Sequence, residues 1–190
     1  MENIKTIWGF DEPTLIEDDI PDPILLGLGS HPHALITGSS GSGKSQSLLF
    51  IIGRTLQILQ ENKIDIDFRI GDFKYSEDYQ FLEEISYPYY FRGFDCYEGI
   101  MSYYKDFSEN RMNKNANKNQ HHFLILDEYQ ATINYYTMYD KQHKTKYSSE
   151  ILSAIAEILM LGRSTQAGVW HIWVVTQVAS ATLFANGTRE

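Results

Sequence analysis

Lys44 and Ser45 are the residues with the clearest chemical purpose, because they end the run GSSGSGKS at positions 38–45. This run fits the pattern G-x-x-x-x-G-K-[ST], in which glycines let the backbone N–H groups surround phosphate oxygens. Lys44 adds a cation for the terminal phosphates, and Ser45 adds a hydroxyl for Mg²⁺. A flexible Gly/Ser linker is the alternative, but a linker needs no lysine and no apolar segment on each side. The pattern therefore predicts ATP and Mg²⁺ as cofactors.

The residues predicted to bind the nucleotide are Gly38, Ser39, Ser40, Gly41, Ser42, Gly43, Lys44, Ser45 and Gln46.

Two adjacent carboxylates, Asp127 and Glu128, end the apolar run FLILDE at positions 123–128. An acid at the end of a strand beside a phosphate loop holds Mg²⁺, directly or through water. Asp127 is expected to be that ligand, together with Ser45. Glu128 is expected to be the general base that takes a proton from the attacking water. The alternative is an apolar strand that happens to end in acids, which the upstream phosphate loop makes less favourable.

Gln177 follows Thr176 at the end of another apolar run, WVVTQ. The carboxyl ends of parallel strands form the ligand crevice of an open α/β sheet. Gln177 is therefore a candidate catalytic residue that contacts the γ-phosphate or the attacking water. The alternative is a strand that simply becomes polar at the surface.

The elements that must position these residues alternate between strand and helix patterns. The expected strands are 33–38, 66–73, 89–94, 122–128 and 169–177. The expected helices are 44–61, 78–85, 95–110 and 149–161, and Asp95 with Glu98 has the form of a capping box. Polar loops are expected at 110–120 and 140–146. This alternation predicts the α/β class, with a mostly parallel sheet covered by helices on both faces.

The composition is that of an ordinary globular protein. The chain has 190 residues, of which 43% are hydrophobic and 22% charged, and one cysteine, which excludes an internal disulfide framework. The net charge of -9 and the pI of about 5.1 confine any DNA contact to a local basic patch. The sequence has no apolar run of about 18 residues and no secretory signal, so we expect a cytoplasmic location and no transmembrane segment of its own.

Four segments together resemble the FtsK/SpoIIIE-type motor ATPases of the FtsK-HerA group. HPHALITGSSGSGKS is similar to the family's Pro-His pair, short strand and phosphate loop, and IGDFKYSE is similar to its Asp-Pro-Lys strand end. LILDEYQ resembles the Asp-Glu strand, and LGRSTQAGVWHIWVVTQ resembles the Gly-Arg, Gly-Ile-His and Thr-Gln stretch. The resemblance covers residues 30 to 189 in the family's order.

The resemblance implies a RecA-like P-loop NTPase fold, a ring that is often a hexamer, and ATP-driven movement of double-stranded DNA through its pore. It also places Arg163 on the arginine that reaches the nucleotide of a neighbouring subunit. The chain is then divided into an irregular or hairpin lead-in at 1–32 and a RecA-like core at 33–190, which lacks the further C-terminal strands of the family.

Three functional hypotheses follow. The first is a DNA-translocating ATPase of a mobile element, phage or plasmid. The second is an FtsK-like ATPase of a protein-secretion system with a membrane-anchored or secretion partner, which is favoured by the acidic charge and by Val178, where DNA translocases often carry a basic residue. The third is a nucleotide-binding regulatory subunit, which the intact set of Lys44, Ser45, Asp127 and Glu128 disfavours.

Overall fold

A five-stranded parallel sheet organises the protein in the computed structural model, which describes residues 4–162 and 168–178. In spatial order the strands are β3 (Ala34–Thr37), β7 (Val169–Thr176), β6 (Gln120–Asp127), β4 (Asp65–Asp72) and β5 (Tyr90–Arg92). β6 and β7 are buried along almost their whole lengths, since helices cover both faces. The expected α/β class is confirmed.

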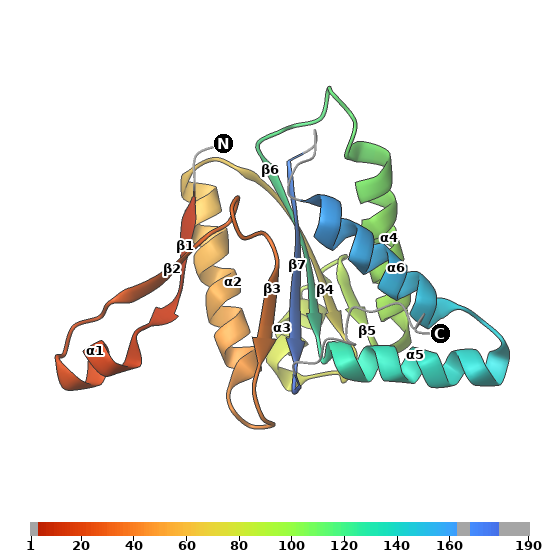
Figure 1. The fold of residues 1–190 in the computed structure, drawn as a ribbon, viewed down its shortest axis with the longest axis horizontal. Helices are drawn as coiled ribbons and strands as arrows, with labels where there is room; N and C mark the ends of the chain where they lie inside the picture. Colours follow the sequence, from red (N-terminus) through yellow and green to blue (C-terminus); the bar gives the residue numbers. More distant parts are fainter. Residues whose placement is uncertain (1–3, 163–167, 179–190) are drawn as a thin grey trace.

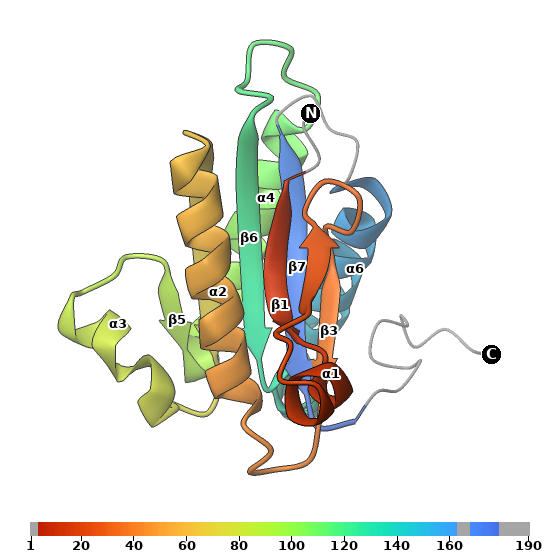
Figure 2. The ribbon, with the colours of Figure 1, turned by 90° about the vertical axis from the view of Figure 1, so that its left-hand side faces the viewer.

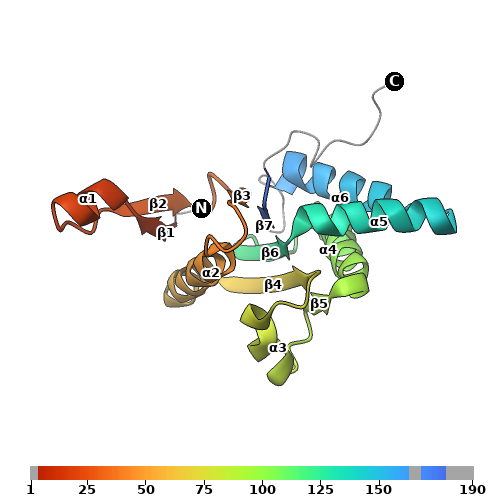
Figure 3. The ribbon, with the colours of Figure 1, turned by 90° about the horizontal axis from the view of Figure 1, so that it is seen from below.

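The helices form two layers, each with its own apolar core. One layer contains α2 (Lys44–Glu61), the 3₁₀ turn η1 (Glu77–Tyr79) and α3 (Gln80–Glu84). The other contains the 3₁₀ turn η2 (Gly93–Asp95), α4 (Cys96–Asn110), α5 (Tyr129–His143) and α6 (Tyr147–Leu161). Figure 3 shows α2 and α4 on opposite sides of the strands.

Residues 4–32 form an arm outside the sheet. β1 (Lys5–Phe10) and β2 (Pro23–Gly27) pair antiparallel, with α1 (Glu12–Glu17) between them. The arm extends away from the sheet in Figure 1 and points toward the viewer in Figure 2. Its base is fixed by a Thr55–Thr6 hydroxyl contact of 3.2 Å and by Trp8, whose ring meets Trp173 edge-on. The division of the chain into a lead-in at 1–32 and a core at 33–190 stays a prediction.

Two sequence-based details are wrong. The expected loop at 140–146 begins too early, because α5 continues to His143. The buried residues of α5 are Tyr129, Thr132 and Tyr136, which follow helical spacing but carry hydroxyl groups. The sequence therefore shows no periodic row of aliphatic residues that would predict this helix. The expected capping box is also absent, because Asp95 has helical dihedral angles and its side chain makes no capping hydrogen bond.

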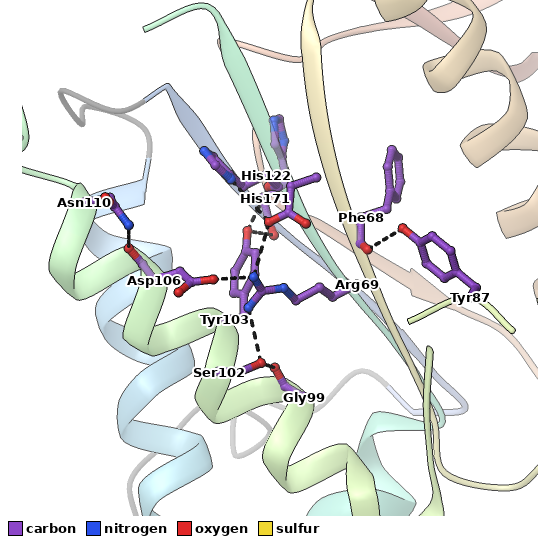
Figure 4. Close-up of polar contacts among 11 residues, drawn as sticks. Phe68, Arg69, Tyr87, Gly99, Ser102, Tyr103, Asp106, Asn110, His122 and His171 are labelled. Atoms are coloured by element: carbon purple, nitrogen blue, oxygen red, sulfur yellow. Dashed lines mark hydrogen bonds and ion pairs between the residues drawn. The ribbon is translucent and has the colours of Figure 1, made fainter. Parts of the chain in front are cut away.

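Polar contacts join α4 in the second layer to three strands of the sheet (Figure 4). The Tyr103 hydroxyl on α4 lies 2.8 Å from the carbonyl oxygen of His122 and 3.0 Å from that of His171. Arg69 on β4 reaches Ser102 and Asp106 on the same helix. These contacts fix α4 against three strands far from the phosphate loop.

Two buried histidines at the same end of the sheet share a hydrogen bond. His171 Nδ1 lies 2.8 Å from the carbonyl oxygen of Pro32, which can only accept, so this nitrogen carries the proton. His171 Nε2 then accepts from His121 Nδ1 at 2.8 Å. Burial lowers the pKa of His121 to about 4 and that of His171 well below its usual value. Both rings are therefore neutral at pH 7.

This pair should make the fold sensitive to acid. In the unfolded chain a histidine takes up a proton near pH 6.5, whereas the folded protein resists protonation until about pH 4 at His121. The contribution of such a histidine to the free energy of unfolding is therefore fully present above pH 6.5. It falls by about 1.4 kcal/mol per pH unit as the pH drops from 6.5 toward the pKa of the folded state. Thermal unfolding between pH 7.5 and 5 measures this slope. His121→Gln should flatten it and the exposed control His31→Gln should not; equal slopes in all three proteins would contradict the assignment.

Candidate nucleotide-binding and hydrolysis site

The predicted site residues within the described part of the chain meet at the carboxyl edge of the sheet, which is the lower edge in Figure 1. β3 leads into the phosphate loop, β6 ends at Asp127, and β7 lies between these two strands. β4 ends beside β6, with Asp72 paired in register with Asp127. Because β7 lies between β3 and β6, the strand that leads into the phosphate loop and the strand that ends in the acids are not direct neighbours.

The phosphate loop has the backbone that its glycines allow. Gly41 has φ +76° and Gly43 has φ +81°, in the left-handed region that other residues rarely adopt. A Cβ on Gly38 would lie 2.7 Å from Ser42 Oγ, so the loop closes tightly there. Gly43 caps α2 without a side-chain hydrogen bond, which leaves the N–H groups of the first turn available to an anion. Lys44 Nζ donates to the carbonyl oxygen of Ser39 at 2.8 Å.

Asp127 lies on the opposite wall with a buried carboxylate, only 4% of the residue being exposed. Ser45 Oγ donates to its Oδ2 at 3.2 Å, and the Tyr79 hydroxyl donates to the same oxygen at 3.0 Å. The backbone N–H of Glu128 donates to Oδ1 at 2.8 Å. Burial raises the pKa of Asp127, and these three hydrogen bonds oppose the rise. Burial and the nearby Asp127 charge raise the pKa of Tyr79 far above its usual value, so Tyr79 stays a neutral donor.

A cavity of about 330 Å³ lies between the loop and the acids. Its lining residues are Ser40, Gly41, Gly43, Lys44, Ser45, Gln46, Asp78, Asp127 and Glu128. Gln46 is held against Asp78 on η1 by a side-chain hydrogen bond. The donor set fits a magnesium polyphosphate, because the phosphate loop supplies N–H groups, a lysine and the Ser45 hydroxyl, and the buried Asp127 carboxylate contacts that hydroxyl.

Glu128 stands at the edge of this cavity in a left-handed backbone conformation, with φ 53° and ψ 40°. Gln177 Nε2 lies 3.5 Å from Glu128 Oε1, so the structure brings these two predicted residues together. Lys74 Nζ lies 2.7 Å from the same oxygen. Gly38, Ser39 and Ser42 belong to the same loop but do not line the cavity. Arg163 lies outside the described residues.

Three contributors were not foreseen. Tyr79 donates to Asp127, Asp78 pairs with Gln46, and Lys74 pairs with Glu128. All three come from the connection after β4, which carries no nucleotide-binding pattern of its own. The one available signal was the similarity of IGDFKYSE to the family's strand end, which marks Asp72 and Lys74 without indicating what they contact.

Comparison with solved structures identifies the fold. The conjugation coupling protein TcpA of pCW3, solved as a monomer form with ATPγS, matches with a TM-score of 0.60 and 15% identity over 86% of this chain and 47% of TcpA. ATPases 2 and 3 of EccC from Thermomonospora curvata, solved with a signal sequence peptide, match with a TM-score of 0.58 and 16% identity over 91% of this chain and 29% of EccC. ATPases 2 and 3 of EssC from Geobacillus thermodenitrificans match with a TM-score of 0.57 and 16% identity over 94% of this chain and 34% of EssC.

The chain thus spans less than half the length of each of these structures. No protein-family model matches the sequence, and no curated protein sequence does either. Within residues 4–162 and 168–178, no helix has the length and apolar character needed to cross a bilayer. The chain has the RecA-like P-loop fold of these structures, and the predicted similarity to FtsK/SpoIIIE-type ATPases is confirmed at the level of the fold.

Proposed function

We propose that this chain is an ATP-hydrolysing motor domain that works in a ring, in the cytoplasm, and moves double-stranded DNA. The observation that carries the proposal is the 3.2 Å contact between Ser45 Oγ and Asp127 Oδ2. It joins the phosphate loop to the acidic strand end, although the two residues lie 82 positions apart. A hydroxyl and a buried carboxylate held together beside a polyphosphate cradle are suited to magnesium-dependent ATP binding.

The roles of the residues follow from their positions. The loop N–H groups and Lys44 would bind the phosphates, and Ser45 with Asp127 would hold Mg²⁺. When bound, Mg²⁺ neutralises charge on the terminal phosphates. Glu128 accepts a proton from water as the water oxygen bonds to the γ-phosphorus and the bond to the β–γ bridging oxygen breaks. Gln177 keeps the Glu128 carboxylate in place through its 3.5 Å contact.

DNA as the transported substrate rests on the basic clusters and on the resemblance of the motifs. In the loop after α4, Arg111 forms an ion pair with Glu157 at 3.5 Å. The exposed cations of this loop are Lys114 and Lys118. Lys141, Lys144 and Lys146 are all exposed where α5 meets α6, at the right-hand end of α5 in Figure 1. We therefore assign the DNA contact to this second cluster.

A secretion ATPase is the second candidate. Two observations favour it: the net charge of -9, and the exposed Val178 directly after Gln177. The EccC structure with a signal sequence peptide adds that a domain of this fold is able to bind a peptide. In that case the ligand is a peptide, and hydrolysis responds to peptide and not to DNA.

Magnesium-dependent ATP hydrolysis with and without duplex DNA tests the proposal. We expect stimulation by DNA that falls steeply with salt, because phosphate contacts release counterions. Lys44→Ala should lose ATP binding with its fold intact, and Lys105→Ala, with a 71% exposed side chain on α4, is the matched control. Replacing Lys141, Lys144 and Lys146 by Gln should remove the stimulation and leave basal hydrolysis. Unchanged nucleotide affinity in Lys44→Ala would contradict the ATP site; hydrolysis indifferent to DNA would favour the secretion reading.

A further inference from the structure

Glu128 is contacted by side chains that follow the two strands on either side of β6. It follows β6, whose neighbours are β4 and β7. Lys74, two residues beyond β4, lies 2.7 Å from Glu128 Oε1, and Gln177, one residue beyond β7, lies 3.5 Å from the same oxygen. Among the described residues both side-chain contacts of the Glu128 carboxylate therefore reach Oε1, which leaves Oε2 for a water molecule.

The turn that presents Lys74 is built around a buried carboxylate. Asp72 is 1% exposed, and its Oδ1 accepts from the backbone N–H of Lys74 at 3.1 Å. Its Oδ2 accepts from the N–H of Ser76 at 2.7 Å and from the Tyr90 hydroxyl at 2.8 Å. Because Asp72 binds the backbone on both sides of Tyr75, the main chain of Lys74 has a fixed position and only its side chain must be ordered to form the ion pair.

The backbone of Glu128 is fixed as well. Its N–H donates to Asp127 Oδ1, and its carbonyl oxygen accepts from the N–H of Thr132 at 3.1 Å and from Thr132 Oγ1 at 3.2 Å. The remaining freedom of Glu128 is the rotation of its side chain. The residue lines both the phosphate-loop cavity and a second cavity of about 280 Å³, which Lys74 and Gln177 also line. Without these two contacts the carboxylate is free to turn between the two cavities.

We propose that Lys74 is a positioning residue for Glu128, and this inference rests on the hydrolysis proposed above. Lys74 and Gln177 hold Oε1 from two sides, so the carboxylate keeps one orientation and Oε2 stays available to the proton of the attacking water. A surface ion pair contributes little to stability, and the Lys74 side chain is 49% exposed. The effect of Lys74 therefore lies in orienting the base, because misplacing a catalytic group by about 1 Å costs up to about 10²-fold in rate.

The test separates this role from a general structural one. In Lys74→Met we expect kcat for ATP to fall about 10- to 100-fold, with KM and the affinity for a non-hydrolysable ATP analogue within about twofold of wild type, a range that corresponds to under about 0.5 kcal/mol. Lys74→Arg should recover part of the lost kcat, because a guanidinium still offers a cation to Oε1. Lys105→Met removes a lysine whose ion pair with Glu109 spans 3.9 Å, and it should behave as wild type. In a Glu128→Gln background, Lys74→Met should cause no further loss.

Four results would overturn the inference: an unchanged kcat in Lys74→Met, an increased kcat, a loss carried by KM, or a Lys74→Arg variant no better than Lys74→Met. An increase would mean that the ion pair holds the base back. Hydrolysis by the wild-type protein distinguishes a failure of the Lys74 proposal from a failure of the proposed ATP hydrolysis. If the wild type hydrolyses ATP and Lys74→Met equals it, only the role of Lys74 fails; if the wild type does not hydrolyse ATP, both proposals fail.

Discussion

Glu128→Gln should bind magnesium ATP as tightly as the wild type and hydrolyse it about 10²- to 10⁴-fold more slowly. The amide keeps the size of the side chain and can still contact Gln177, but it cannot accept a proton from water. Equilibrium binding of a labelled nucleotide together with single-turnover hydrolysis measures the two effects separately. Glu109→Gln, an exposed acid on α4, is the matched control and should leave both quantities unchanged.

Asp127→Asn provides the contrast to Glu128→Gln. Asp127 is buried and accepts from Ser45, Tyr79 and the Glu128 N–H, so an amide there weakens the proposed Mg²⁺ site and disturbs its donors. We expect a binding curve that requires more Mg²⁺, whereas Glu128→Gln leaves that requirement alone. Wild-type hydrolysis by Glu128→Gln would mean that another group accepts the proton.

Arg163→Ala should bind ATP normally and lose about 10³- to 10⁵-fold in hydrolysis, the range found for arginine fingers in other NTPases. Lys44 is proposed to bind the phosphates of the ground state, so the charge that develops in the transition state needs another cation. Arg163 follows Gly162, the last residue described after α6, and the resemblance assigns this arginine to a neighbouring subunit. Wild-type activity per chain should therefore rise with protein concentration as rings assemble, which a dilution series measures.

Mixing Arg163→Ala with Glu128→Gln gives the sharper result. Some interfaces in a mixed ring combine an intact Glu128 with an intact Arg163, so part of the activity should return. Fluorescence exchange between labelled subunits checks that mixed rings form. If they form and the mixture remains as inactive as each variant alone, Arg163 does not act between subunits, and Arg189 is the next candidate.

The sequence could predict the elements that have a strong local signal. The phosphate loop, the apolar strands and α2 were foreseen because glycine spacing and aliphatic periodicity are local properties. α5 was not, because Thr132 and Tyr136 cover its buried face in place of aliphatic residues. The position of β7 between β3 and β6 could not be predicted from the sequence either, since strand order depends on how the helices pack across the sheet.

The residues of the candidate site also fall into those that could be predicted from the sequence and those that could not. Lys44, Ser45, Asp127 and Glu128 lie in recognisable runs and could be assigned from residue types. Tyr79 and Lys74 could not, because their roles exist only through contacts with Asp127 and Glu128 across 48 and 54 positions of chain. A tyrosine in a short helix and a lysine after a strand occur in many proteins, and only the folded sheet edge places them beside the acids.

The position of β3 at the edge of the sheet determines when this strand can pair during synthesis and folding. Within the described residues β3 pairs only with β7, with Ala34 opposite Trp173 and Thr37 opposite Thr176. β3, which leads into the phosphate loop, is therefore synthesised 139 residues before the strand with which it pairs. Contacts between segments this distant form slowly, because the intervening chain must first lose its freedom. The proposed nucleotide binding therefore requires β7, and ATP added during refolding should stabilise only those molecules in which β7 has already docked.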